Sequence, residues 1–297
     1  MSAVLEKRHF LVESGLRLVG DVAGNEQAPC VVLMHGGGQT RFSWSQAGKH
    51  LVAAGYRVIN FDARGHGESE WAGPGGYTLG RHAADLRAIL REMGLTESGV
   101  PFALVGASLG GGTALRALAE GMCPAAVVLV DIVPNPDPRG VRRVRDFMLA
   151  RPDGYASLDE AADAIAAYNP HRPRPADVSG LRNNLREGPD GRFHWHWDPA
   201  FIKRDVDESI AELAETLEGA RSAGDIPVLL IKGGDSDVVN DQGAALLREA
   251  LPNLEIAEIA GAGHMVAGDR NDAFNAAVLD FLDGHFPANQ TINTRDV

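Results

Sequence analysis

The chain has 297 residues, 44% hydrophobic and 23% charged, which is enough to bury the core of one large globular domain. Its formal net charge of −12 argues against nucleic acid and anionic membranes as partners. The N-terminal residues lack a signal-peptide pattern, and no apolar run reaches membrane-spanning length. We therefore predict a cytoplasmic protein in which Cys30 and Cys123, both beside apolar runs, are buried and reduced.

The first half of the chain alternates strands with helices. Residues 7–22 alternate apolar and polar side chains around Ser14-Gly15, which predicts an antiparallel hairpin at a sheet edge. Continuous apolar runs predict strands buried on both faces, and stretches with helical spacing lie between them. The predicted strands are 30–34, 56–61, 101–106 and 125–130, and the predicted helices are 43–54, 79–93 and a segment beginning after 112. This order indicates an α/β fold with a mostly parallel, doubly wound sheet.

The pattern changes at Pro134. Up to about Gly224 the strand runs vanish, Pro and Arg become frequent, and helical stretches occur at 141–150 and 158–168. We interpret residues 134–224 as a mostly helical cap inserted into a core of residues 1–133 and 225–297. Regular order then resumes with strands at 226–231 and 254–259, helices at 242–251 and 271–286, and a polar, frayed tail after residue 287.

Ser108 lies where a strand must become a helix within a few residues. Gly106 and Gly110 flank it in the pattern G-x-S-x-G, and both allow the tight bend of a nucleophile elbow. Three consecutive glycines, residues 36–38, follow the strand at 30–34 and His35, and they let the backbone approach a substrate carbonyl oxygen. Four polar residues follow the carboxyl ends of predicted strands: His35, Asp62, Ser108 and Asp131. We therefore expect them to meet at the edge of the sheet where ligands bind.

A serine hydroxyl needs a base, and the base needs an acid that fixes its tautomer. In this architecture the order along the chain is serine, acid, histidine, so only His264 and His285 qualify as base. His264 lies in a glycine-rich loop directly after a strand, whereas His285 lies in the last turn of the terminal helix and is assigned a capping role. We therefore predict His264 as the base.

The acid has three candidates. Asp235 and Asp237 follow the strand at 226–231, and Asp131 ends an earlier strand. Asp237 lies closest to the expected position when counted back from the apolar pair that starts the next helix. We favour Asp237, then Asp235, then Asp131, and the unused aspartates are assigned to helix N-caps.

Four motifs in this order resemble the α/β-hydrolase superfamily across residues 7–133 and 225–286. They are His35-Gly36-Gly37-Gly38, Asp62-x-Arg64-Gly65-His66-Gly67-x-Ser69, Gly106-Ala107-Ser108-Leu109-Gly110 and Gly263-His264. The resemblance implies Ser108 as nucleophile, His264 as base, an aspartate in the 233–239 loop, and an oxyanion hole from the N–H groups of Leu109 and Gly37. The family's usual aspartate position holds Ser236 here. Similar sequences with this glycine-rich loop are named esterases or non-haem peroxidases.

The predicted cap has its highest aromatic density at residues 192–199. If this segment is extended, Trp195 and Trp197 share one face and His194 and His196 the other. We predict that the tryptophans line an apolar substrate pocket, and we predict no metal site because the histidines lack a third ligand at suitable spacing. The arginines at 139, 142, 143 and 145 are interpreted as a solvated helix face. His66, between two glycines, is assigned structural hydrogen bonds.

These observations predict a cofactor-free serine hydrolase that cleaves an ester, a lactone or a related acyl bond of a small, partly apolar molecule. A serine at position 108 excludes the carboxylate nucleophile of epoxide hydrolases and haloalkane dehalogenases in this superfamily. Hydrolysis of a C–C bond in a diketone, and non-catalytic binding of a small molecule on the same scaffold, remain alternatives. The oligomeric state is left open.

Overall fold

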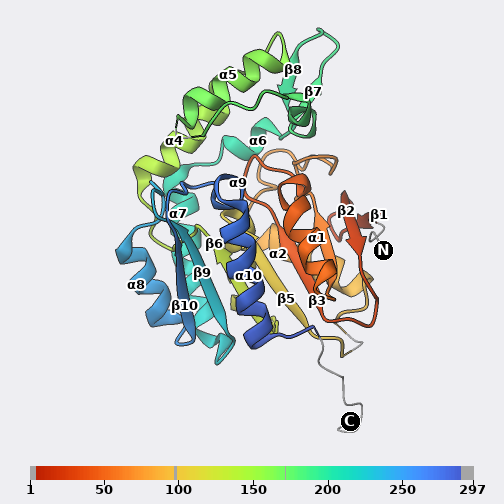
Figure 1. The fold of residues 1–297 in the computed structure, drawn as a ribbon, viewed down its shortest axis with the longest axis vertical. Coiled ribbons are helices and arrows are strands. Elements are labelled where there is room, and N and C mark those ends of the chain that lie inside the picture. Colours follow the sequence, from red (N-terminus) through yellow and green to blue (C-terminus); the bar gives the residue numbers. More distant parts are fainter. Residues whose placement is uncertain (1–4, 97–98, 171, 289–297) are drawn as a thin grey trace.

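A computed structural model describes residues 5–96, 99–170 and 172–288. An eight-stranded sheet in the order β1-β2-β4-β3-β5-β6-β9-β10 runs through the molecule (Figure 1). β1 and β2 form the antiparallel hairpin predicted at one edge, and β4, β3, β5, β6, β9 and β10 are mutually parallel. The strands are β1 (Glu6–Leu11), β2 (Arg17–Ala23), β3 (Cys30–Met34), β4 (Arg57–Phe61), β5 (Phe102–Ala107), β6 (Ala126–Val130), β9 (Val228–Gly233) and β10 (Leu254–Ile259).

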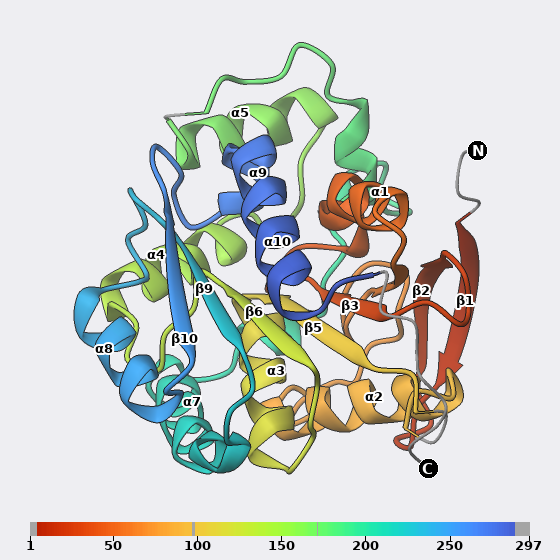
Figure 2. The same ribbon diagram turned by 60° about the horizontal axis from the view of Figure 1, so that its bottom comes forward.

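Helices cover both faces of the sheet, as predicted for a doubly wound fold (Figure 2). One face packs against α1 (Ser45–Ala53) and α10 (Asn271–His285). The other packs against α2 (Leu79–Glu92), α3 (Leu109–Ala119), α7 (Val206–Ala220) and α8 (Asp241–Ala250). Every residue of β3 and β6 is buried, which explains why their sequences are continuously apolar rather than alternating. Strand β4 is buried throughout as well, but it also holds the polar Arg57 and Asn60. Short helices complete the fold: η1 (Arg41–Trp44), η3 (Arg221–Ala223) and α9 (Val266–Asp269).

Helix α7 differs from its predicted place in the cap. Its buried Leu213 and Leu217 belong to the same apolar cluster as Leu118 of α3. A β-carbon added to Gly219 would lie 2.7 Å from that of Ala119, so this glycine allows α7 and α3 to approach closely. The sequence did not predict this packing, because α7 comes before the strands resume and its sequence resembles the helical stretches that precede it.

The rest of the predicted cap forms a lobe of residues 138–202 at the top of Figure 1. Helix α4 (Pro138–Leu149) begins after the N-cap Asp137, and α5 (Leu158–Tyr168) begins after the N-cap Ser157. The lobe also holds a small antiparallel hairpin that the sequence did not predict. This hairpin consists of β7 (Leu185–Glu187) and β8 (Phe193–Trp195). The short helix η2 (Ser179–Asn183) precedes it, and α6 (Pro199–Ile202) follows it.

The two thiols differ in exposure. Cys30 is buried in β3 as predicted, whereas Cys123 is exposed, because it lies in the turn after α3 and before β6. No helix within the described ranges combines the length and apolarity that a membrane crossing requires. The tail predicted to fray begins at residue 288, and residues 289–297 lie outside the described residues.

Candidate active site

Ser108 occupies the sharp turn between β5 and α3. Its φ of 45° and ψ of −108° place it in a region that non-glycine residues rarely adopt. A β-carbon on Gly106 would lie 2.3 Å from the Gly110 carbonyl, and one on Gly110 would lie 2.2 Å from the Met34 carbonyl oxygen. Only glycine fits at both positions, so the G-x-S-x-G pattern forms the predicted strained elbow at the end of β5.

His264 and Asp131 form a hydrogen-bonded pair beside this elbow. The His264 Nδ1 atom lies 2.7 Å from Asp131 Oδ2. Asp131 follows β6, the strand adjacent to β5, and is 1% exposed. Its other oxygen, Oδ1, accepts a hydrogen bond from the Gly233 N–H, and Oδ2 also accepts one from the Ser236 hydroxyl at 2.6 Å. The carboxylate is therefore fixed by three donors and oriented toward the imidazole.

The structure does not pair His264 with Asp237, the aspartate that the sequence favoured. Asp237 instead forms an ion pair with Arg143 of α4, with 2.6 Å between Oδ2 and Nη1. The runner-up, Asp235, is exposed. In this loop Ser236, at the position where the family resemblance implies an aspartate, donates its hydroxyl to Asp131 Oδ2. The carboxylate paired with His264 therefore comes from the end of the neighbouring strand β6. The sequence does carry a signal for this arrangement: Asp131 directly follows a buried strand that neighbours the strand before Ser108.

The glycine-rich loop lies against the elbow. The Gly36 N–H donates to Gln39 Oε1, and the Gly38 N–H donates to His66 Nε2. Across the described ranges, the N–H groups of Gly37 and of Leu109, the first residue of α3, form no hydrogen bond. Both residues line the same cavity as Ser108.

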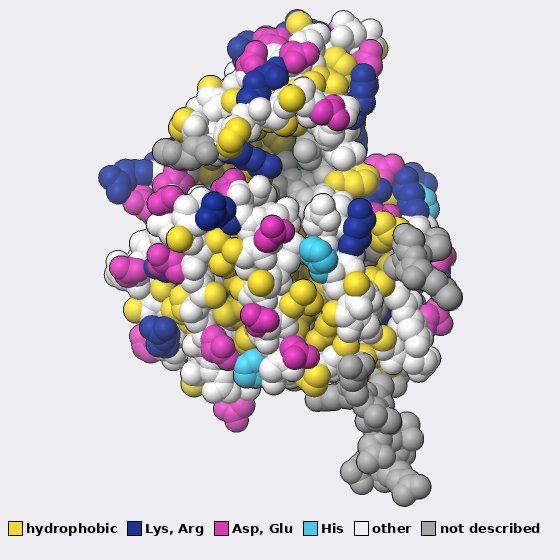
Figure 3. Space-filling view, viewed as in Figure 1, with side chains coloured by type: hydrophobic (Ala, Val, Ile, Leu, Met, Phe, Trp, Pro, Cys, Tyr) yellow, Lys and Arg dark blue, Asp and Glu magenta, His cyan; other side chains and the backbone are white. Residues whose placement is uncertain are grey.

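A cavity of about 820 Å³ lies between the carboxyl ends of the strands and the lobe of residues 138–202. Ser108, His264 and Asp131 line its floor. Trp195 and Trp197 both line its upper wall and stack with 4.6 Å between ring centroids, as their predicted shared face requires. Figure 3 shows the surface hollowed between α4 and α5 above and the body of the molecule below. The walls are mostly apolar, which suits a partly apolar small molecule.

The two histidines beside these tryptophans do not form a metal site. His194 Nε2 lies 3.0 Å from Asp190 Oδ2 near the surface, whereas His196 is buried against the core. Among the residues that the structure describes, no cluster of three potential metal ligands occurs.

Comparison with known proteins settles the family, because residues 29–270 match the family model described as the alpha/beta hydrolase fold. The chain belongs to the alpha/beta hydrolase family. It is 31% identical to the esterase Rv0045c of Mycobacterium tuberculosis over 86% of this chain and 83% of that one. A crystal structure of Rv0045c superposes with a TM-score of 0.73, covering 95% of this chain and 93% of the other at 27% identity.

Two further relatives carry different names. An sn-1-specific diacylglycerol lipase of Mus musculus is 30% identical over 87% of this chain and 82% of its own. A non-heme chloroperoxidase of Burkholderia pyrrocinia is 27% identical over 87% of this chain and 93% of its own. These matches confirm the predicted superfamily and support a hydrolase.

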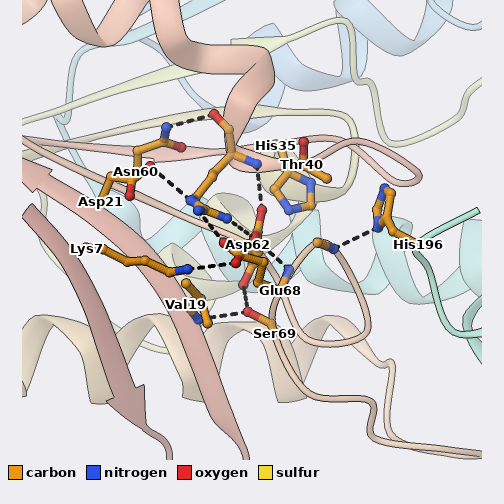
Figure 4. A network of polar contacts seen from close by, with 12 residues as sticks. Lys7, Val19, Asp21, His35, Thr40, Asn60, Asp62, Glu68, Ser69 and His196 are labelled. Atoms are coloured by element: carbon orange, nitrogen blue, oxygen red, sulfur yellow. Dashed lines mark hydrogen bonds and ion pairs between the residues drawn. The ribbon is translucent and has the colours of Figure 1, made fainter. Parts of the chain in front are cut away.

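In this alpha/beta hydrolase the loop of residues 62–69 supports the glycine-rich loop from below. Asp62 is fully buried and accepts hydrogen bonds from the Arg41 backbone N–H at 2.7 Å and from the Glu68 N–H at 2.9 Å (Figure 4). Its carboxylate also forms an ion pair with the Arg41 guanidinium at 2.5 Å. The Ser69 hydroxyl donates to the Asp62 carbonyl and accepts from the Val19 N–H. The motif around Asp62 is therefore structural.

Three buried imidazoles connect these loops to the lobe. Nε2 of His35 accepts from the Ala63 N–H, Nε2 of His66 from the Gly38 N–H, and Nδ1 of His196 from the Gly67 N–H. Burial lowers the pKa of His35 to about 4 and that of His66 to about 3, and it lowers the pKa of His196 well below the usual value. Each ring is therefore neutral and acts as an acceptor, which confirms the structural role predicted for His66.

These neutral histidines should make the protein sensitive to acid. An unfolded histidine takes up a proton near pH 6.5, whereas His66 with its lowered pKa stays neutral in the fold, so stability is lost as pH falls below 6.5. We expect His66 alone to remove roughly 2 kcal/mol from the free energy of unfolding between pH 7 and pH 5. Urea denaturation at both pH values measures the loss.

The matched variants are His66→Gln, whose side-chain oxygen can replace the acceptor Nε2, and His50→Gln on the surface of α1. The first should reduce the stability loss on acidification, and the second should leave it unchanged. An equal loss in both variants would contradict the assignment of acid sensitivity to this cluster.

Proposed function

We propose that this alpha/beta hydrolase cleaves carboxylic esters or lactones of small, partly apolar molecules, with Ser108, His264 and Asp131 as its catalytic triad. The observation that supports this most strongly is the 2.7 Å pair between His264 and Asp131 in the cavity that also holds the strained Ser108. Relatives named as an esterase and a lipase agree with ester chemistry.

In the proposed mechanism His264 Nε2 removes the proton from Ser108 Oγ as Oγ bonds to the carbonyl carbon of the ester. Asp131 Oδ2 holds the Nδ1–H and stabilises the imidazolium that forms. His264 then gives its proton to the departing alcohol oxygen, which leaves an acyl-enzyme. A water molecule, deprotonated by the same Nε2, releases the acid and restores the Ser108 hydroxyl.

Ser108 Oγ and the His264 imidazole line one cavity but form no hydrogen bond within the described chain. Such catalytic hydrogen bonds often tighten only in the complex with substrate. The mechanism therefore requires a small adjustment of the Ser108 or His264 side chain when an ester binds.

The developing oxyanion would be held by the backbone N–H groups of Gly37 and Leu109. Three successive glycines offer three candidate donors, but Gln39 occupies the N–H of Gly36 and His66 occupies that of Gly38. Gly37 is therefore the available donor of the loop. Leu109 supplies the second N–H because the first turn of a helix has no internal acceptor for it.

We further propose that the lobe of residues 138–202 acts as the cap of the site. Trp197 and Met148 lie directly over the glycine-rich loop, and a β-carbon on Gly38 would lie 2.7 Å from the Met148 methyl group and 3.3 Å from the Trp197 ring. Phe201 packs over Gly37 in the same way. These side chains would exclude water and bind the apolar part of a substrate.

A fluorophosphonate probe tests the proposal directly, because it reacts with serines that a neighbouring base activates. We expect stoichiometric labelling of the wild-type protein, located at Ser108 by peptide mass spectrometry and lost on prior heat denaturation. A folded protein that resists the probe would instead favour a small-molecule-binding protein on this scaffold.

A further inference from the structure

Helix α4 carries four arginines, and one of them differs from the rest. Three were correctly interpreted as a solvated face: Arg139 pairs with Asp137, Arg142 with Asp207 and Arg143 with Asp237. Their side chains are between 49% and 88% exposed. The fourth, Arg145, is half-buried and lines the cavity, so the prediction of a solvated face was wrong for this residue.

Arg145 faces the cavity. It lies four residues after Val141 and three before Met148, so the three side chains occupy one side of the helix, and all of them line the cavity. Its Nε atom is buried and has no hydrogen-bond partner. Within the described chain no carboxylate lies within ion-pair distance of its guanidinium.

Arg145 is half-buried, and its buried Nε–H lacks the hydrogen-bond acceptor that buried donors normally have. Removing an N–H from water without an acceptor is unfavourable, and a charged donor is affected more than a neutral one. A ligand that enters the cavity can supply the missing acceptors, and a carboxylate matches the planar donor set of arginine best.

The other charged groups of the cavity wall are mostly occupied. Arg174 pairs with Asp159 and Asp163, and Arg204 pairs with Glu212. Arg172 lines the opposite rim beside α9, and in the described ranges it has no carboxylate partner. The two acidic side chains of the wall already accept hydrogen bonds: Asp131 from His264 and Ser236, and Asp269 from the Gly263 N–H.

We propose that Arg145 binds a carboxylate of the substrate, so that this enzyme prefers esters that carry a second, negatively charged group. Arg172 on the facing rim adds to the positive potential along the entrance. The inference rests on the proposed ester hydrolysis and specifies its substrate class: an anionic organic ester with an apolar part between the two functional groups.

The test compares esters that match in size and differ in charge. One pair places the carboxylate in the acyl part, 4-nitrophenyl hydrogen glutarate against 4-nitrophenyl pentanoate. The other places it in the leaving group, 4-acetoxybenzoate against 4-acetylphenyl acetate. The measured quantity is the ratio of kcat/KM for the anionic ester to that for the neutral ester, in wild type, Arg145→Met and Arg142→Met.

We expect the wild-type ratio to exceed that of Arg145→Met at least tenfold in one of the two pairs. Arg145→Lys should restore part of it, and added salt should lower it in the wild type. Arg142→Met, which removes an outward charge from the same helix, should keep the wild-type ratio. Where Arg145→Met does not fold, Arg145→Gln gives the same comparison.

A binding measurement separates this inference from the proposed function. Calorimetric titration of the Ser108→Ala protein with 4-nitrophenyl hydrogen glutarate should show at least tenfold tighter binding than the same protein carrying Arg145→Met. Equal affinities, or equal kinetic ratios in Arg145→Met and the wild type, overturn the role of Arg145. Hydrolysis that persists in Ser108→Ala overturns the proposed mechanism instead.

Discussion

The Ser108→Ala variant is expected to hydrolyse 4-nitrophenyl acetate about 10⁴- to 10⁶-fold more slowly than the wild type, measured as kcat. The substitution removes the oxygen that would form the acyl-enzyme. The backbone need not change, because Gly106 and Gly110 create the turn. The cavity, the free N–H groups and the pair of His264 with Asp131 would remain.

The matched control is Ser43→Ala, which removes another hydroxyl from the wall of the same cavity. This variant should stay within about threefold of the wild type, since Ser43 lies in η1 and not in the turn between β5 and α3 beside the His264–Asp131 pair. If Ser108→Ala and Ser43→Ala had the same activity, the proposed nucleophile would be wrong.

Asp131→Asn is expected to lower kcat by about 10³- to 10⁴-fold, whereas Asp237→Asn should change it less than about threefold. An amide at residue 131 turns its NH₂ group toward a donor in either orientation, because one carboxylate oxygen accepts from Gly233 N–H and the other from His264 and Ser236. When the amide oxygen accepts from Gly233, the NH₂ group faces His264 Nδ1. The imidazole would then adopt the wrong tautomer for proton removal. Asp237 forms its ion pair with Arg143, so its replacement leaves the hydrogen bond to His264 intact.

Steady-state kinetics of Asp131→Asn, Asp235→Asn and Asp237→Asn under one set of conditions distinguish the three aspartates. Thermal melting of each variant controls for loss of fold. A large loss of kcat in Asp237→Asn with full activity in Asp131→Asn would return the assignment to the aspartate that the sequence favoured.

The sequence predicted the mostly parallel sheet with helices on both faces, and it predicted the places of Ser108 and His264. Strands such as β3 and β6 are buried on both faces and therefore read as unbroken apolar runs. The glycines around Ser108 are required because a β-carbon at either position would lie within 2.5 Å of neighbouring backbone. Features with such strong local causes can be predicted without knowledge of the tertiary contacts. His264 followed from chain order and from its loop after β10.

The remaining features depend on contacts between distant segments. The choice between Asp131 and Asp237 depends on how the loop after β9 turns, and Ser236 rather than Asp237 faces β6. Arg145 is indistinguishable from Arg142 and Arg143 by composition, and only the docking of α4 over the cavity separates them. Neither the turn of the loop after β9 nor the docking of α4 can be predicted from the spacing of residues along the chain.

The elbow serine and Asp131 are the two non-glycine residues in the described chain with positive φ, at 45° and 49°. Such conformations destabilise a fold by on the order of 1–3 kcal/mol each, so this enzyme gives up thermal tolerance to keep its reactive groups in place. Glycine at either position would relieve the conformational penalty and, with the triad that we propose, would abolish turnover. A search for heat-resistant variants that did not also screen for turnover would therefore be drawn toward inactive proteins at these two sites.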